Sequence, residues 1–258
     1  MCRLLAFSFR ENTHKQNRLD LLDSFRELAC TGIVPRGLPL GHHDGWGLSV
    51  YSQKEDGPIS YKSVSSALHD EDFIPSEFIK DEISQSGLVH LRKKSVGEKS
   101  ILNTHPFTEG GFSFIHNGTV EKGDGPYKEL SSLCVGETDS EKLFRKFLSL
   151  QKERSTLDAY VEMITTTKEL YPTFSALNTI LHDGKYVYVS RVVNTENPLY
   201  ISFGLENYYT LYIGASKEGD LVVSSEKCAY KDITYSLLPN NSVCVIEVAT
   251  GAQTLIAL

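Results

Sequence analysis

The chain has 258 residues, of which 40% are apolar and 23% are charged, an ordinary globular composition that argues against disordered and fibrous proteins. Its formal net charge is −7 and its lysines and arginines are scattered, so nucleic acid is not an expected partner. The five cysteines are odd in number and form no CxxC pair, which favours free thiols in a reducing compartment over a disulfide framework.

The apolar stretch near the N-terminus contains only six residues, between Arg3 and Arg10. It is too short for the core of a signal peptide or for a membrane span, and no other segment approaches membrane length. We therefore expect a cytoplasmic protein without a membrane partner. Because no repeat or low-complexity tract interrupts the chain, we expect one domain over residues 1–258, with Met1 removed.

The N-terminal half predicts a mixture of strands and helices. A strand over residues 3–9 precedes a helix over 17–30, whose apolar residues share one face and which stops at Gly32. Further strands are expected at 47–52 and 111–116, and a strand-like run ends at Arg92. A second helix, over 138–150, opens with a capping box of Thr138 and Glu141, and a third runs from 155 to about 170.

The C-terminal part predicts strands joined as hairpins. The expected strands are residues 174–181, 185–193, 211–216, 221–226, 242–248 and 253–258. Tight turns at Asp183-Gly184, Glu218-Gly219 and Thr250-Gly251 join them in pairs. Most strands are thus antiparallel neighbours, and the helices cluster in the middle of the chain. This order predicts an α+β fold with helices covering two stacked sheets, rather than a doubly wound parallel sheet.

Cys2 directly follows the initiator methionine, and its small side chain normally allows that methionine to be trimmed. The residue would then carry both a thiol and a free α-amine. An α-amine titrates at about pH 7.7–8.0, where a general base works well, and the thiol is the best side-chain nucleophile near neutrality. The plainer interpretation is a small apolar residue at the start of an edge strand, and position two alone favours it.

Three further segments carry the polar groups that such a nucleophile needs. Asn117 and Gly118 follow a predicted strand, where an amide and a backbone N–H can converge on an oxyanion, although His-Asn-Gly also makes a good turn. Arg92 can grip a carboxylate, or lie on the surface within its basic run. Asp139 can pair with an ammonium, or merely complement a helix dipole. Together these groups predict a pocket for glutamine.

Six short motifs occur in an order that resembles a known family. They are MCRLLAF at the start, HHDGWGL at 42–48, HLRKKS at 90–95, NTHPF at 103–107, FIHNGTV at 114–120 and GETDSE at 136–141. The order is that of the class II glutamine amidotransferases, and the chain most resembles a stand-alone branch with DGWG and HPF signatures. The match spans residues 2 to about 145, and the later part agrees in its strand-rich character.

The resemblance implies a fold and a set of roles. The implied fold is a four-layer αββα sandwich of two mainly antiparallel sheets, that of the N-terminal-nucleophile (Ntn) hydrolases. The implied roles are Cys2 as nucleophile, Asn117 and Gly118 as oxyanion hole, Arg92 as carboxylate binder and Asp139 as amino-group binder. Ser95 stands where the family usually has a threonine beside the carboxylate, and it keeps the hydroxyl.

The histidines suggest a metal site, but their spacing does not. Six potential ligands fall within 75 residues, namely His42, His43, Asp44, His90, His105 and His116. No HExxH or comparable spacing appears, so we expect no metal. Asp44 and Trp46 are predicted to shape the pocket wall, with core packing as an equal alternative for Trp46. His105 is predicted to line the site or to brace a turn.

The expected reaction is thiolate attack on the γ-amide of glutamine or a γ-glutamyl compound, loss of ammonia or an amine, and hydrolysis of the thioester, without a cofactor. The length leaves no room for a fused synthetase domain. The chain is therefore expected to be a glutaminase that delivers ammonia to a synthetase partner, or a self-sufficient γ-glutamyl amide hydrolase. A metal-dependent hydrolase and a non-catalytic binding module stay open as alternatives.

Overall fold

Two antiparallel β-sheets form the centre of the computed structural model, which describes residues 2–10, 13–51, 57–74, 86–120, 126–229 and 233–258. The strands are β1 Arg3–Ser8, β2 Trp46–Tyr51, β3 Pro58–Ser63, β4 Ser86–Leu91, β5 Phe107–Glu109, β6 Phe112–Asn117, β7 Asn178–His182, β8 Tyr186–Arg191, β9 Tyr212–Ala215, β10 Leu221–Ser224, β11 Thr234–Leu237, β12 Ser242–Glu247 and β13 Gln253–Ala257. The α-helices are α1 Lys15–Thr31, α3 Asp139–Gln151, α4 Thr156–Leu170 and α5 Leu199–Ser202, and the 3₁₀ helices are η1 Ala67–His69, η2 Glu71–Phe73, η3 Ile101–Asn103 and η4 Lys128–Leu133.

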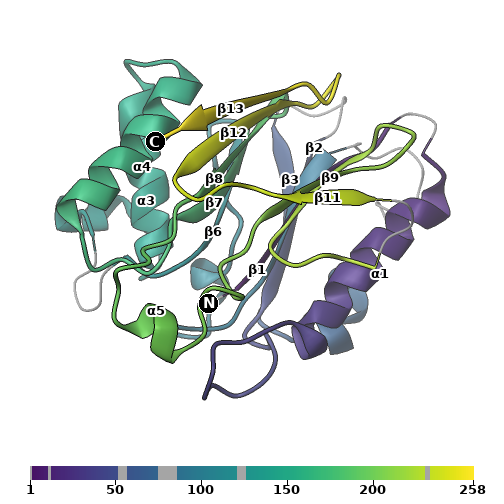
Figure 1. The fold of residues 1–258 in the computed structure, drawn as a ribbon, viewed down its shortest axis with the longest axis horizontal. Helices are drawn as coiled ribbons and strands as arrows, with labels where there is room; N and C mark the ends of the chain where they lie inside the picture. The colour runs from purple at the N-terminus through teal and green to yellow at the C-terminus, as the bar shows by residue number, and fades with distance from the viewer. Residues whose placement is uncertain (1, 11–12, 52–56, 75–85, 121–125, 230–232) are drawn as a thin grey trace.

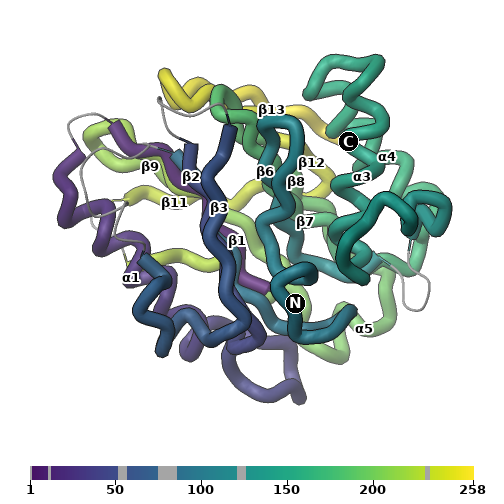
Figure 2. The backbone as a smooth tube through the Cα atoms, turned by 180° about the vertical axis from the view of Figure 1, so that it is seen from behind, coloured from purple at the N-terminus to yellow at the C-terminus, as the bar shows by residue number. Residues whose placement is uncertain are grey.

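The sheets and helices form four layers (Figure 1). The seven-stranded sheet has the order β11-β9-β10-β1-β4-β2-β3, and the six-stranded sheet has the order β13-β12-β8-β7-β6-β5. Helix α1 covers the outer face of the first sheet, and α3 and α4 cover the outer face of the second. The view from behind shows the same arrangement (Figure 2). The predicted α+β fold, an αββα sandwich of mainly antiparallel sheets, is confirmed.

Each interface between layers has its own apolar core. Alternate residues of a strand face opposite sides of its sheet, so Leu4 packs between the two sheets while Leu5 packs toward α1. In the second sheet, Ile115 faces the first sheet, and Phe114 stacks on Phe144 of α3 with ring centroids 5.6 Å apart. Apolar residues on both faces of a strand are what a sheet buried between two layers requires.

The predicted helices and hairpins are present, with small shifts at their ends. The helix predicted over 17–30 extends over Lys15–Thr31 and ends at Gly32, and Thr138 caps α3 by accepting a hydrogen bond from the Glu141 backbone N–H at 3.2 Å. Strands β7 and β8, β9 and β10, and β12 and β13 pair as antiparallel hairpins. Strand β7 begins only at Asn178, because Ala176 pairs with Val193 as an isolated bridge.

Three strands escaped the sequence analysis, and all three lie at sheet edges. Strands β3 and β11 end the seven-stranded sheet, and β5 ends the six-stranded sheet. An edge strand pairs with only one neighbouring strand and leaves its other backbone edge unpaired. Its sequence can therefore be short and polar. β3 and β11 are mostly half-buried or exposed, and β5 has only three residues, so the alternating apolar pattern is weak.

The ends of three strands meet at one point of the sandwich. β1 is antiparallel to β4, with Arg3 opposite Leu91. The residue just before β1 and the residue just after β4 therefore lie side by side, where these two strands end. β6 of the other sheet ends at Asn117, which contacts Cys2 at these strand ends. Cys2, Arg92 and Asn117 are thereby brought together although they are distant in sequence.

Within the part of the chain that the structure describes, no helix has both the length and the apolar character to cross a bilayer.

Candidate active site

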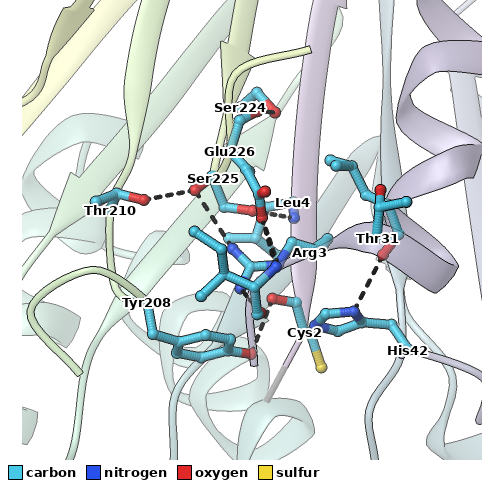
Figure 3. Close-up of polar contacts among 12 residues, drawn as sticks. Cys2, Arg3, Leu4, Thr31, His42, Tyr208, Thr210, Ser224, Ser225 and Glu226 are labelled. Atoms are coloured by element: carbon cyan, nitrogen blue, oxygen red, sulfur yellow. Dashed lines mark hydrogen bonds and ion pairs between the residues drawn. The ribbon is translucent and has the colours of Figure 1, made fainter. Parts of the chain in front are cut away.

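Cys2 is fixed where the two sheets meet. It is buried, and its backbone N–H donates a hydrogen bond to Asn117 Oδ1 at 2.7 Å. The hydroxyl of Tyr208 donates to the Cys2 carbonyl at 3.2 Å (Figure 3). The same hydroxyl lies 3.4 Å from Asn117 Oδ1. Burial raises the pKa of Tyr208 well above its ordinary value, so this hydroxyl stays protonated as a donor. Both ends of the Cys2 backbone are therefore held.

Asn117 presents an unused donor beside Cys2. Its Oδ1 accepts from the Cys2 N–H, so the other end of the amide must be the NH₂ group. That Nδ2 is buried and has no hydrogen-bond partner among the described residues. A buried donor without a partner is costly, and donors of this kind are typical of sites that bind a developing negative charge.

Gly118 lies next to this donor and admits no side chain. A Cβ atom there would lie 1.9 Å from the Ala176 carbonyl oxygen and 2.7 Å from His116 Nε2. His116 is itself fixed, since Nε2 donates to the Ala176 carbonyl at 3.1 Å and Nδ1 accepts from Ser140 Oγ at 2.9 Å. Neither Asn117 nor Gly118 has a positive φ, so the left-handed turn considered as an alternative for His-Asn-Gly is not what the structure contains.

The thiol of Cys2 is acidified. Burial raises its pKa, but in the chain that still carries Met1 the positive charge of the N-terminus, the His90 ring and a backbone contact to Lys93 more than offset burial, and the pKa falls from 9.0 to about 5. The thiolate is then the main form at neutral pH. Burial acts without such compensation on two other thiols, and it raises the pKa of Cys228 to about 12 and that of Cys244 to about 11.

This contrast predicts a selective pH profile for alkylation. We expect iodoacetamide to modify Cys2 at a rate that is half-maximal near pH 5, because the pKa of its thiol is about 5 and only the thiolate reacts. Below that pH the rate should fall about tenfold per pH unit as the thiolate is protonated. Peptide mass mapping of Cys2 and Cys228 after timed exposure measures both residues at once. A midpoint for Cys2 near pH 9, like an ordinary thiol, would contradict the assignment.

His90 is a site residue that sequence analysis treated only as a possible metal ligand. It is buried in β4, and its electrostatic interaction with Cys2 lowers the pKa of that thiol, while neither of its ring nitrogens has a hydrogen-bond partner among the described residues. It stacks on His105 with ring centroids 4.2 Å apart, and burial together with the His90 charge lowers the pKa of His105 well below its ordinary value. The available signal was the two-residue spacing of His90 and Arg92, which places both on one face of the strand.

Arg92 is buried rather than exposed, which excludes the surface alternative. Its guanidinium donates to the carbonyl oxygens of Val96 at 3.1 Å, Gly97 at 3.4 Å and Glu98 at 3.0 Å. The following loop is held from outside as well, since the Lys94 N–H donates to Asp44 Oδ2 at 2.8 Å. Of the five N–H donors of a guanidinium, these bonds leave some for another acceptor.

Asp139 combines the two interpretations that the sequence left open. It is the first residue of α3, where a negative charge is favourable, and its Oδ2 accepts from the Val120 N–H at 2.8 Å. Its Oδ1 accepts from the Ser140 N–H at 2.9 Å. The carboxylate is buried and also lines the cavity at Cys2. One backbone N–H on each carboxylate oxygen thus fixes the orientation of Asp139 at the cavity.

Most of the predicted site residues share one narrow cavity. Its lining includes Cys2, Arg92, Ser95, His105, Gly118 and Asp139. Its volume is about 20 Å³, room for about one water molecule. A substrate the size of glutamine must therefore displace wall side chains, and the loop of residues 93–98 carries part of that wall.

Three predicted site residues, Asn117, Asp44 and Trp46, do not line this cavity. Trp46 is buried in the core between the first sheet and α1, where it meets Phe73 edge-on with ring centroids 5.2 Å apart. Its indole N–H donates to Asp70 Oδ2 at 2.9 Å. Of the two interpretations left open for Trp46, this position favours core packing, because its face of β2 points away from the other sheet. Asp44 instead accepts the hydrogen bond from the Lys94 N–H, in the loop that also carries Ser95.

The histidines that the structure describes do not form a set of metal ligands, although His105 and His116 both line the cavity at Cys2. His42 Nδ1 lies 3.2 Å from the Leu28 carbonyl oxygen, His43 lies beside Ser66, and His116 is bonded to Ser140. Over the described ranges, no three His, Cys, Asp or Glu side chains are grouped so that they could hold a metal ion. The geometry gives no support to the alternative of a metal-dependent hydrolase.

Comparisons with known proteins agree with this geometry. The family model for class-II glutamine amidotransferases matches residues 1–202. The Escherichia coli (strain K12) protein YafJ is 32% identical over 205 residues, which cover 72% of this chain and 71% of YafJ. The Saccharomyces cerevisiae protein DUG3 is 24% identical over 252 residues, which cover 80% of this chain and 70% of DUG3. A solved class-II domain protein from Silicibacter pomeroyi is similar over 100% of both chains with a TM-score of 0.64 at 20% identity, a likeness of fold. From the match over residues 1–202 and the similarity to YafJ, we conclude that this chain belongs to the class-II glutamine amidotransferases.

Proposed function

We propose that the protein hydrolyses the γ-amide of glutamine, or of a γ-glutamyl compound, through a thioester on Cys2. The observation that carries the proposal is the pairing of Cys2 with Asn117. The Asn117 Oδ1 accepts from the Cys2 N–H at 2.7 Å, the Nδ2 of the same amide has no partner among the described residues, and the pKa of the Cys2 thiol is about 5.

The proposed reaction begins when Met1 has been removed, so that the Cys2 nitrogen is an α-amine. The thiolate attacks the γ-carbonyl carbon, and the carbonyl oxygen gains negative charge that Asn117 Nδ2 and the Gly118 N–H stabilise. The α-amine, which has taken up the proton of the thiol, passes it to the leaving nitrogen, the C–N bond breaks, and ammonia or an amine departs. Water then adds to the thioester, the C–S bond breaks, and glutamate and the free thiol are released.

Arg92 and Asp139 are proposed to hold the amino-acid end of the substrate. A carboxylate that enters the cavity replaces carbonyl oxygens of residues 96–98 as an acceptor for the Arg92 guanidinium, a stronger, charge-assisted partner. The ammonium then meets the Asp139 carboxylate, whose orientation the Val120 and Ser140 N–H groups fix. The exchange of partners at Arg92 gives glutamine the room that the present cavity lacks.

The proposal is tested by intact mass and by labelling with diazo-oxo-norleucine, a glutamine-like electrophile. We expect the active protein to be lighter by one methionine, and to gain one label that peptide mapping places on Cys2. An excess of glutamine should slow the labelling, because both compounds compete for the same pocket. Active protein that retains Met1, or labelling that avoids Cys2, would contradict the mechanism.

A further inference from the structure

A much larger cavity adjoins the narrow one at Cys2. Its volume is about 910 Å³, in the upper range of small-molecule sites. Ser95 and Val96 line both cavities. Gly118 lines the narrow cavity, and the next residues, Thr119 and Val120, line the large one. The large cavity therefore begins beside the position where a γ-carbonyl would meet the thiol.

The wall of the large cavity is mainly apolar and carries little charge. Leu38, Val96, Val120, Leu199, Phe203 and Leu205 supply apolar surface. Among the described residues that line it, Glu196 is the one Asp, Glu, Lys or Arg. An apolar or aromatic group gains by entering such a space, whereas an anion would be desolvated and repelled.

Hydrogen bonds fix this wall in place. Asn194 Nδ2 donates to the Pro172 carbonyl at 2.8 Å, and Asn197 Nδ2 donates to the Thr173 carbonyl at 3.0 Å. Nearer to the thiol, the Thr119 N–H donates to Ser175 Oγ at 2.8 Å, and that oxygen lies 2.9 Å from the Tyr209 hydroxyl. The cavity is thus formed in advance, which lowers the entropic cost of binding.

From this arrangement we infer that the preferred substrate is the γ-glutamyl amide of an apolar or aromatic amine without a negative charge, with the amine seated in the large cavity. The inference rests on the proposed function and names its substrate class. Ammonia, the leaving group of glutamine, needs none of this space. The amine leaves with the proton that the Cys2 α-amine delivers to its nitrogen, and water completes the release of glutamate.

Three amides with similar alkylamine leaving groups test the inference. They are the γ-glutamyl methylamide, the benzylamide and the 4-carboxybenzylamide, compared with glutamine by measuring glutamate release. We expect kcat/KM for the benzylamide to exceed that for the methylamide by about tenfold or more, since burial of an apolar group gives discrimination of this size. The added carboxylate should remove that advantage, and Glu196→Gln should restore part of it.

Two variants of α5 provide a matched pair. Leu199 lines the large cavity and is 49% exposed, whereas Ile201 is 78% exposed and does not line it. We expect Leu199→Asp to lower the ratio of benzylamide to glutamine kcat/KM by about tenfold. Ile201→Asp should keep the wild-type ratio.

The outcomes separate this inference from the proposed function. If the wild type hydrolyses glutamine but gains nothing from the benzyl group, or if Leu199→Asp keeps the wild-type ratio, the substrate class is wrong while the Cys2 mechanism stands. If no amide releases glutamate and diazo-oxo-norleucine leaves Cys2 unlabelled, the proposed function itself fails.

Discussion

Replacing Cys2 by alanine is expected to lower kcat for glutamine hydrolysis by about four to six orders of magnitude, the size seen when a covalent nucleophile is removed. The thiolate has no substitute in the site, because the other titratable groups that line the cavity are bound to the backbone or are imidazoles. Glutamate release under saturating glutamine measures the effect. Cys30→Ala is the matched control, since Cys30 is a free and exposed thiol, and it should keep wild-type kcat.

A chain that carries a removable peptide before Cys2 separates the nucleophile from the base. The thiol remains, but the Cys2 nitrogen is an amide and can no longer accept a proton. We expect a loss of about 10²–10⁴-fold in kcat, the usual contribution of a general base. Cleavage of the peptide to leave Cys2 as the first residue should restore activity in the same sample. Equal activity before and after cleavage would show that the α-amine is not the base.

The second large effect is expected from Asn117→Asp. Aspartate keeps an oxygen that accepts from the Cys2 N–H but replaces the Nδ2 donor, which has no partner among the described residues. Loss of one oxyanion-hole donor typically lowers kcat by about 10²–10³-fold, and the added negative charge opposes the oxyanion further. The measurement is kcat for glutamine hydrolysis at pH 8, where the thiol is ionised in both proteins.

Alkylation by iodoacetamide supplies the internal control for Asn117→Asp. This displacement generates no tetrahedral oxyanion, so it reports on the thiolate and not on the oxyanion hole. We expect alkylation of Cys2 at pH 8 to change far less than amide hydrolysis. If both rates fall together, Asn117 acts by holding Cys2 in place. If neither falls, the Nδ2 donor has no part in the reaction.

The sequence predicted which residues form the site better than it predicted how they are arranged. The ordered motifs pointed to Cys2, Arg92, Ser95, His105, Gly118 and Asp139, and the structure places all of them around one cavity. The sequence did not show that Arg92 would be bonded to three carbonyl oxygens of its own loop. It also gave His90 no role beside the thiol, because that contact requires β1 and β4 to be neighbours.

Trp46 shows why the facing of a side chain is harder to predict than its burial. The sequence left a pocket role and core packing equally open for it, and it is buried in the core. In a sheet covered on both sides, however, each face of a strand leads to a different core. Moving a side chain by one position along the strand changes whether it faces the outer core or the space between the sheets. Because both faces carry apolar residues, the sequence shows no alternation that would tell which face is which.

The sequence by itself determined the features that local interactions control. The Asp183-Gly184 turn set a hairpin, Thr138 set the start of α3, and position two made Cys2 a candidate nucleophile. Only the tertiary structure decided how Asn117 meets Cys2 across 115 residues, and how the loops around Ser95 and Thr119 join a narrow cavity to a wide one. Such contacts depend on the stacking of whole sheets, whose register and facing no short stretch of sequence encodes.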